Sequence, residues 1–342
     1  MTPEPAEAGR SWPAVSVIVL THNGGQFIGG LLDSLADQSY PKDMMEVLVV
    51  DNASSDDTRE IAQARPFARF IALEDNLGYA AGNNLAVGHA SHDTLAFLNQ
   101  DVICHRDWLA GLVAALMDHE EAGAVTSNMV MPWCAEYQAK ERFRPLDVLY
   151  YVDLSCFGYG AFKRNGTDAL VHPRIISGCA FCLRRRTVEE QGKLFEEDLR
   201  MYVEDTDLSL RLRNMGLEVL AVRASVVYHL HEGAPEINQR RLAIGMRAIM
   251  NRVYVYYKNM STPEFWAYLP LLALGGPMKI FEMPLNPMKR ALYFVPFALL
   301  SLGCMAAALC TLGRFRQARG KALGSRRGGT FHLLRQLFQR TA

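Results

Sequence analysis

Apolar residues in the first 130 positions follow first the period of a strand and then the period of a helix, several times over. Residues 15–20 form an uninterrupted apolar and β-branched run, which predicts a strand buried on both faces. From Ile28 to Leu35 the apolar positions have helical spacing. The pattern then repeats, with strands predicted at 47–50, 70–73, 95–98 and near Val125, and helices ending at Ala90 and spanning about 107–117. Successive strand-then-helix units predict an α/β fold with a mostly parallel sheet.

Polar side chains follow the carboxyl ends of these predicted strands. Because the carboxyl ends of parallel strands meet at one sheet edge, the side chains form a rim of the kind at which nucleotides bind. The rim residues are Thr21, Asn23, Asp51, Asn52, Asn76, Asn99 and Asp101. No G-x-G-x-x-G motif follows the first strand and the chain has no Walker lysine, which disfavours dinucleotide binding and ATP hydrolysis.

The tripeptide Asn99-Gln100-Asp101 ends the strand at 95–98 with two amides and a carboxylate. Oxygen ligands at such a position suit a hard cation such as Mg²⁺ or Mn²⁺, and through it a phosphate. The alternative is an ordinary surface turn, in which Asn and Asp are common.

The second part of the chain is more irregular. Residues 132–173 are rich in aromatic side chains, which indicates a lid, the wall of an acceptor site or a packed satellite core. A strand is predicted at 175–183, and then a helix whose first turn is crowded by acids, where the helix dipole stabilises anions. These acids are Glu204, Asp205 and Asp207. Strands at 219–222 and 226–228 lead to His229 and His231.

Composition narrows the possibilities. The 342 residues have a formal net charge of zero, so nothing indicates a nucleic-acid partner. The seven cysteines have no disulfide-framework spacing, which indicates a reducing compartment, and we expect Cys179 and Cys182 to be buried thiols rather than a redox or metal pair. Residues 1–13 lack the apolar core of a signal peptide and are predicted to be a disordered tail.

The carboxyl-terminal part is apolar and then basic. Residues 265–281 contain two prolines and two glycines, so they cannot form one straight spanning helix. Residues 291–312 are uncharged, and 22 helical residues extend roughly 30 Å, enough to cross a bilayer. We favour interfacial or re-entrant helices over a single span, because a span would place the basic tail outside. That tail, 311–342, has eight Lys or Arg and no acid; it either lies near anionic lipid or is a solvated, disordered end.

Seven motifs in order resemble a known family. Together they are similar to the family 2 glycosyltransferases with a GT-A fold, close to bacterial rhamnosyltransferase-like members, over roughly residues 14–260. The motifs are Val17-Ile18-Val19-Leu20-Thr21-His22-Asn23, Val49-Val50-Asp51-Asn52-Ala53-Ser54-Ser55-Asp56-Asp57-Thr58, Asn76-Leu77-Gly78-Tyr79-Ala80-Ala81-Gly82-Asn83-Asn84, Leu98-Asn99-Gln100-Asp101, Ser177-Gly178-Cys179-Ala180-Phe181, Tyr202-Val203-Glu204-Asp205-Thr206-Asp207-Leu208 and Val227-Tyr228-His229.

The resemblance implies a role for each matching residue. Asp205 would be the catalytic base with Glu204 beside it, Asp101 and His229 would bind a divalent metal, and His229 is favoured over His231. The nucleotide-sugar would be bound by Thr21, Asn23, Asp51, Asn52, Asn76, Gly78, Asn83, Asn99 and Gln100. Asn99 departs from the pattern, because the family has an acid at that position and an amide brings no charge.

The chemistry agrees with that resemblance. Transfer from a nucleoside-diphosphate sugar needs a cation to neutralise the leaving diphosphate and a base to take the proton of the acceptor hydroxyl. One such base fits a single displacement that inverts the anomeric centre. Two alternatives stay open: a membrane-associated glycan-binding or scaffold protein that kept the fold, suggested by Asn99, and a nucleotidyltransferase on a similar sheet.

The resulting expectation is an enzyme at the cytoplasmic face of a bacterial inner membrane. It would transfer rhamnose or another deoxyhexose to a glycan acceptor that is lipid-linked or part of the cell envelope, with the membrane surface as a partner. The predicted organisation is a tail (1–13), a GT-A catalytic domain (14–260) with a nucleotide-binding half (14–130) and an acceptor half (131–260), membrane-associated helices (261–313) and a basic tail (314–342).

Overall fold

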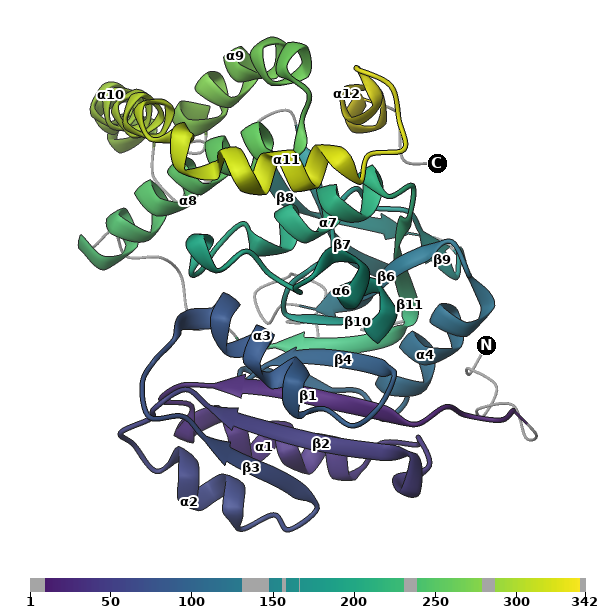
Figure 1. Cartoon of the computed structure of the whole chain (residues 1–342). Coiled ribbons are helices and arrows are strands. Elements are labelled where there is room, and N and C mark those ends of the chain that lie inside the picture. The colour runs from purple at the N-terminus through teal and green to yellow at the C-terminus, as the bar shows by residue number, and fades with distance from the viewer. Residues whose placement is uncertain are drawn as a thin grey trace.

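A mixed β-sheet runs through the centre of the molecule (Figure 1). The computed structural model describes residues 10–130, 148–155, 158–165, 167–230, 239–278 and 287–338. The strand order is β3-β2-β1-β4-β10-β6-β11-β5, and β9 pairs with β11. The strands are β1 (Val15–Thr21), β2 (Met45–Asp51), β3 (Ala68–Ala72), β4 (Thr94–Asn99), β5 (Val102–Cys104), β6 (Ala122–Val130), β9 (Leu170–Val171), β10 (Ala180–Arg184) and β11 (Glu218–His229).

The predicted parallel sheet is confirmed for the first half of the chain. Strands β1, β2, β3 and β4 pair in parallel. Strand β10 is antiparallel to both β4 and β6, and β11 is parallel to β6. Successive residues of β1 point to opposite faces, so that Val17 and Val19 enter one apolar core while Ile18 and Leu20 enter another.

Helices cover both of these cores. On the face of Val17 lie α1 (Gly25–Ala36), α2 (Thr58–Gln63) and α4 (Trp108–Asp118). The face of Ile18 is covered by α3 (Gly78–His89), α6 (Arg185–Gln191) and α7 (Glu204–Asn214). The predicted helical spacing is confirmed, since Ile28, Leu31, Leu32 and Leu35 are all fully buried.

Three predicted elements differ in the structure. The strand expected at 175–183 begins only at Ala180, because the preceding amides bond to side chains: Ile176 donates to Ser209 Oγ at 3.0 Å and Ser177 to Thr126 Oγ1 at 3.2 Å. The strands expected at 219–222 and 226–228 are one strand, β11, with an irregular register between them.

The aromatic middle segment was expected to be irregular, and for its described residues this is wrong. Strands β7 (Val148–Ser155) and β8 (Gly158–Asn165) form an antiparallel hairpin, as their aromatic and β-branched residues allow. Residues 132–147, 156, 157 and 166 of that segment lie outside the described residues. The predicted burial of Cys179 and Cys182 is confirmed, and burial raises the pKa of each thiol to about 12.

Five helices gather at the end of the molecule remote from β3 (Figure 1). They are α8 (Gln239–Asn259), α9 (Thr262–Met278), α10 (Pro287–Cys310), α11 (Arg316–Gly324) and α12 (His332–Phe338), with a 3₁₀ turn at Leu312–Phe315. Within the described residues no single helix has both the length and the apolar composition to cross a bilayer. One pair, Phe294–Cys310 and Leu312–Gly324, passes that test together but is bent by 55°.

Parts of both predicted tails pack against the rest of the molecule, which corrects the disorder expected for residues 10–13 and argues against the solvated end, one of the two interpretations left open for the basic tail. Residues 311–338 pack on the helices, where the Arg319 guanidinium lies 4.4 Å from the Tyr257 ring and Arg326 forms a buried ion pair with Glu264. At the other end Trp12 packs edge-on against Tyr40, with ring centroids 5.0 Å apart. Residues 1–9 lie outside the described residues.

Arg326→Ala tests whether this ion pair fastens the carboxyl-terminal segment. The arginine bonds both oxygens of Glu264, at 2.6 and 2.9 Å, and the carboxylate is fully buried. Because the variant leaves that charge without its cation, we expect a loss of about 3 kcal/mol in the free energy of unfolding, measured by urea denaturation. The exposed Arg335→Ala is the control, and an equal loss there would contradict the assignment.

Candidate active site

The register of the sheet brings the predicted rim together. Thr21 at the end of β1 pairs with Asp51 at the end of β2, and Leu20 pairs with Asn99 at the end of β4. The carboxyl ends of three adjacent strands therefore stand at one level. Asn52 continues this edge, and its backbone N–H donates to the backbone carbonyl of Thr21 at 2.8 Å.

Asn52 organises one side of the rim. Its buried carboxamide accepts a hydrogen bond from Leu77 N at 2.8 Å and donates to Asn76 Oδ1 at 3.1 Å and to the Gly78 carbonyl at 3.3 Å. Gly78 has a φ of +83°, which only glycine adopts without strain, and it begins α3. Asn83 is buried on α3 and donates to the Tyr79 carbonyl at 2.9 Å.

The other side of the rim is a pair of crossed loops. Asp51 is buried and accepts from Ser54 N at 3.1 Å. Asn23 is exposed, and its Oδ1 accepts from Ser55 N at 2.9 Å. The Asn23–Ser55 bond joins the loop after β1 to the loop after β2, and the Asp51–Ser54 bond closes the second loop on itself, so both polar residues shape the rim.

The tripeptide Asn99-Gln100-Asp101 ends β4 and forms a tight turn into β5. The sequence pattern predicted such a turn as the alternative to a cation site. Gln100 turns its side chain toward β1, where Oε1 accepts from Thr21 Oγ1 and from His22 N, both at 2.8 Å. Gln100 therefore supports the rim from within. Asn99 differs, since its Oδ1 is buried and has no hydrogen-bond partner in the described part of the chain.

The turn also brings Asp101 to His229, as the sequence predicted for a metal pair. Strand β5 runs antiparallel to β11 with Val102 opposite His229, and this register leaves Asp101 Oδ1 3.2 Å from His229 Nε2. His231 lies outside the described residues. Among the described residues no group of three His, Cys, Asp or Glu is placed to hold a metal.

This donor set fits a divalent cation that takes its remaining ligands from a diphosphate and water. A carboxylate oxygen, an imidazole nitrogen and the unpartnered amide oxygen of Asn99 are donors that Mn²⁺ accepts, and Mg²⁺ accepts the oxygens. Only one of the three carries a charge when the imidazole is neutral. The protein alone therefore offers such an ion a weak site.

Glu204 and Asp205 occupy the first turn of α7. Asp205 Oδ1 accepts from Thr206 N at 2.6 Å, and the amide of Gly178 also donates to this carboxylate. Burial nevertheless raises the pKa of Asp205. Burial, followed by repulsion from Asp205, raises the pKa of Glu204 to about 8. Burial is the largest cause of the raised pKa in both acids.

Tyr79 connects the two sides of the site, and sequence reasoning gave it no role. It follows Gly78 on α3, and its hydroxyl donates to the Gly178 carbonyl at 2.8 Å. Burial, reinforced by the carboxylates of Glu204, Asp205 and Asp101, holds the pKa of this phenol well above its ordinary value. The acids of α7 and of the β4–β5 turn therefore act electrostatically on the same tyrosine.

A strained loop leads into the first turn of α7. Arg200, Tyr202 and Val203 all have a positive φ, between 57° and 72°, in the left-handed region that disfavours side chains. Asn251 on α8 holds the loop, since its buried Nδ2 donates to the carbonyls of Leu199, Met201 and Tyr202 at 3.0 to 3.1 Å. No local sequence signal identifies this asparagine beyond its being a polar residue in an amphipathic helix.

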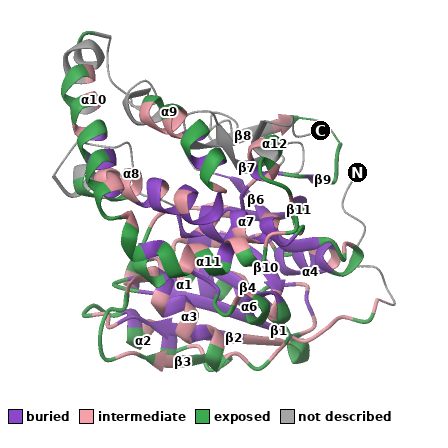
Figure 2. Ribbon diagram, turned by 45° about the horizontal axis from the view of Figure 1, so that its top comes forward, coloured by how far each residue is buried: buried purple, intermediate pink, exposed green. Residues whose placement is uncertain are grey.

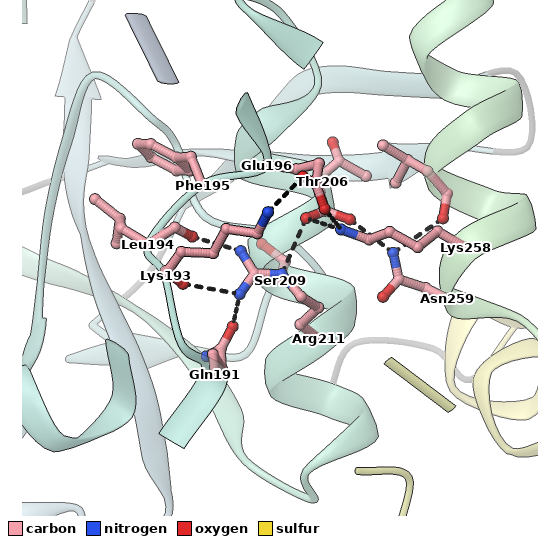
Figure 3. A network of polar contacts seen from close by, with 12 residues as sticks. Gln191, Lys193, Leu194, Phe195, Glu196, Thr206, Ser209, Arg211, Lys258 and Asn259 are labelled. Carbon is pink, nitrogen blue, oxygen red and sulfur yellow. Dashed lines mark hydrogen bonds and ion pairs between the residues drawn. The ribbon is translucent and has the colours of Figure 1, made fainter. Parts of the chain in front are cut away.

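A polar network lies behind that turn (Figure 3). The fully buried Asp207 accepts from Lys258 Nζ at 2.7 Å, Arg211 Nε at 2.9 Å and Asn259 Nδ2 at 2.8 Å. Burial alone would raise the pKa of Asp207, but Lys258 and Arg211 hold it below its ordinary value. Lys258 also bonds Glu196 at 3.1 Å. Asp207 is thus structural, whereas Asp205 faces the site.

Comparison with known proteins gives a consistent result. The model of Glycosyl transferase family 2 matches residues 16–190, just over half of the chain. A probable glycosyltransferase, YdaM, of Bacillus subtilis is 28% identical over 239 residues, which are 66% of this chain and 53% of that protein. The O-antigen biosynthesis protein RfbC of Myxococcus xanthus is 30% identical over 238 residues, which are 66% of this chain and 18% of that protein. The chain thus spans about half or less of the length of these relatives.

Solved structures agree on the fold. The mannosyltransferase PcManGT of Pyrobaculum calidifontis, in complex with GDP-Man and Mn²⁺, has a TM-score of 0.54 at 21% identity and covers 93% of this chain and 89% of its own. TarS 1–349 of Staphylococcus aureus has a TM-score of 0.54 at 17% identity, and the match covers 96% of this chain and 93% of the TarS chain. The GT-A fold, a curled and mostly parallel sheet, is therefore shown.

Glu204→Gln tests the burial of the acid pair. In the unfolded chain Glu204 loses its proton near pH 4.5, and in the folded protein near pH 8, so the wild type loses stability as the pH rises through that window. The variant lacks this titration. We therefore compare the free energy of unfolding of the variant with that of the wild type by urea denaturation. The difference in favour of the variant should be larger at pH 9 than at pH 4 by on the order of 3 kcal/mol. Glu197→Gln, at an exposed position, is the control; a difference independent of pH would contradict the buried acid.

Proposed function

Because the chain belongs to glycosyl transferase family 2, we propose that it transfers a sugar from a nucleoside-diphosphate sugar to a hydroxyl of a glycan acceptor. One observation carries this proposal. Tyr79 adjoins the Asn52 rim through Gly78, bonds to Gly178 beside Asp205, and lies in the field of Asp101. A donor diphosphate on the rim and an acceptor at Asp205 would thus share one site.

Asp205 is the base of this proposed reaction. Its carboxylate takes the proton from the acceptor hydroxyl while that oxygen forms a bond to the anomeric carbon and the bond to the diphosphate breaks. A single displacement of this kind inverts the anomeric centre. With its pKa raised to about 8, Glu204 holds its proton at neutral pH, so Asp205 is the member of the pair proposed to accept one.

The rim residues would bind the donor. The base and ribose of the donor are expected at the rim, and Gln100 supports it from within. The rim residues proposed for this role are Thr21, Asn23, Asp51, Asn52, Asn76, Gly78 and Asn83. Asp101, His229 and the amide of Asn99 would hold Mg²⁺ or Mn²⁺ beside the diphosphate. When bound, that ion neutralises the charge of the leaving group.

The motif pattern and the carboxyl-terminal helices support a more specific proposal for the donor sugar, the acceptor and the location. The donor sugar is proposed to be rhamnose or another deoxyhexose, and the acceptor a lipid-linked or cell-envelope glycan. Two apolar stripes support a membrane surface as partner: Trp266 and Leu274 on α9, and Val295, Leu299 and Leu302 on α10, are 48% to 66% exposed. The proposed location is the cytoplasmic face of a bacterial inner membrane.

A second candidate is a glycan-binding or scaffold protein that kept the fold and lost turnover. Asn99 favours it, because an amide replaces the expected acid. Turnover of a nucleoside-diphosphate sugar would exclude this candidate, and release of pyrophosphate in place of a nucleoside diphosphate would indicate a nucleotidyltransferase.

Asp205→Asn tests the base. The amide keeps the shape and accepts no proton, so we expect kcat to fall roughly 10² to 10⁴-fold while the Kd of the nucleoside diphosphate stays within twofold. Release of nucleoside diphosphate is measured over a panel of sugar donors with Mn²⁺ and lipid-linked acceptors. Asp118→Asn, exposed on α4, is the control, and full activity of Asp205→Asn would refute the role.

Metal binding supplies a separate test. Because the chain offers one carboxylate, one imidazole and one amide, Mn²⁺ should bind the protein alone weakly and at least tenfold more tightly with a nucleoside diphosphate present. Calorimetry with and without UDP and GDP measures both affinities. Asp101→Asn should abolish the gain; a tight site in the protein alone would contradict the assignment.

A further inference from the structure

A cavity of about 410 Å³ lies between α8 and the strained loop that precedes α7. Its lining combines three arginines, Arg200, Arg247 and Arg314, with the apolar side chains of Met246 and Met250 and the ring of Tyr254. We propose that this cavity binds the head of an amphiphile that joins a diphosphate to a hydrocarbon chain. This proposal rests on the proposed function, in which the cavity would bind the lipid end of the acceptor.

The charge of the cavity fits a diphosphate. The three arginines come from three segments of the chain, and the lining contains one acid, Asp198, so the net charge is +3 − 1 = +2. Within the described residues no carboxylate forms an ion pair with any of the three guanidinium groups. Unpaired guanidinium groups converging on one space are the preferred partners of phosphate oxygens. Arg314 is already oriented, since it lies 4.8 Å from the rings of both Tyr254 and Phe315.

The floor of the cavity fits a hydrocarbon chain. Met246, Met250 and Tyr254 recur every fourth residue and form one stripe along α8. Helix α10 packs against α8, and its exposed Val295, Leu299 and Leu302 lie on one face at helical spacing. Figure 2 shows that α10 stands at the margin of the molecule with much of its surface exposed. Helix α10 ends at Cys310, four residues before Arg314 of the lining, so its apolar face and the charged cavity belong to consecutive segments of the chain.

The cavity adjoins the loop that leads to the proposed base. Asn251 contributes to the lining, and its amide bonds the carbonyls of Leu199, Met201 and Tyr202, the loop that enters α7 just before Asp205. Arg200 of the lining belongs to this same loop. A head group bound there would lie beside the residues that place the base.

A neighbouring polar cavity of about 420 Å³ does not share these properties. Lys193, Arg211 and Lys258 line it, but each is engaged by Glu196 or Asp207. These three cations therefore serve the network behind α7, whereas Arg314, which lines both cavities, and Arg200 and Arg247 of the first cavity form no ion pair with a carboxylate of the described residues.

Farnesyl diphosphate is the probe, titrated into the full-length protein by calorimetry below its critical micelle concentration. We expect it to bind at least tenfold more tightly than farnesol, which lacks the charge, and than inorganic pyrophosphate, which lacks the chain. Arg247→Ala combined with Arg314→Ala should weaken farnesyl diphosphate at least tenfold and leave farnesol unchanged. Arg316→Ala, two residues from Arg314 and outside the lining, is the matched control and should bind like the wild type.

Four results would overturn the proposal. Equal affinity for pyrophosphate would make the cavity a simple anion site, and equal affinity for farnesol an apolar one. Displacement of farnesyl diphosphate by UDP or GDP would place the probe on the donor rim. Unchanged binding by the double variant, with its thermal unfolding temperature like that of the wild type, would place the probe elsewhere on the chain.

The assay separates this inference from the proposed function, because it contains neither donor nor turnover. Binding as expected, together with no release of nucleoside diphosphate from any donor, would retain the cavity and reject the transferase. Release of nucleoside diphosphate with no arginine-dependent binding of the probe would reject the cavity alone.

Discussion

The buried carboxylate of Asp207 is the constraint on which the site depends. A fully buried charge is tolerated only with partners, and here Lys258, Arg211 and Asn259 supply them. Two of the three stand at the end of α8, so the requirement locks α8 against the start of α7. Asn251 belongs to α8 as well. One helix therefore fixes the acidic turn from behind, holds the loop that enters it and lines the cavity beside it.

The same arrangement explains how strain and burial coexist around Asp205. Left-handed backbone at Tyr202 and Val203 costs of order 1 to 3 kcal/mol at each residue, and three carbonyl bonds from Asn251 oppose it. The start of a helix and the amides of Thr206 and Gly178 favour an ionised Asp205. Burial outweighs them, so the pKa is raised and the carboxylate becomes a better proton acceptor than an exposed one.

How far the sequence predicts this structure depends on how far apart in the sequence the contacting residues are. The rim of Thr21, Asp51 and Asn99 was predictable, because parallel strands with apolar runs deliver their carboxyl ends to one edge. The reversal of β10, the β7–β8 hairpin and the ordered basic tail were not, because strand direction and docking are set by distant partners such as Glu264 for Arg326. Tyr79 was visible within a motif, but its role required the position of Gly178, 99 residues away. The assigned site roles stay predictions.

The charges and burial around the site give a physical reason for an amide, and not an acid, at Asn99. Burial, and after it the negative charges of Glu204, Asp205 and Asp101, already raise the pKa of the Tyr79 phenol. The Oδ1 of Asn99 is buried without a partner, so a carboxylate there would add another uncompensated charge at a large desolvation cost. An amide keeps the oxygen and removes the charge. The amide at position 99 therefore leaves Asp101 and Asp205 as the carboxylates that the proposed chemistry uses.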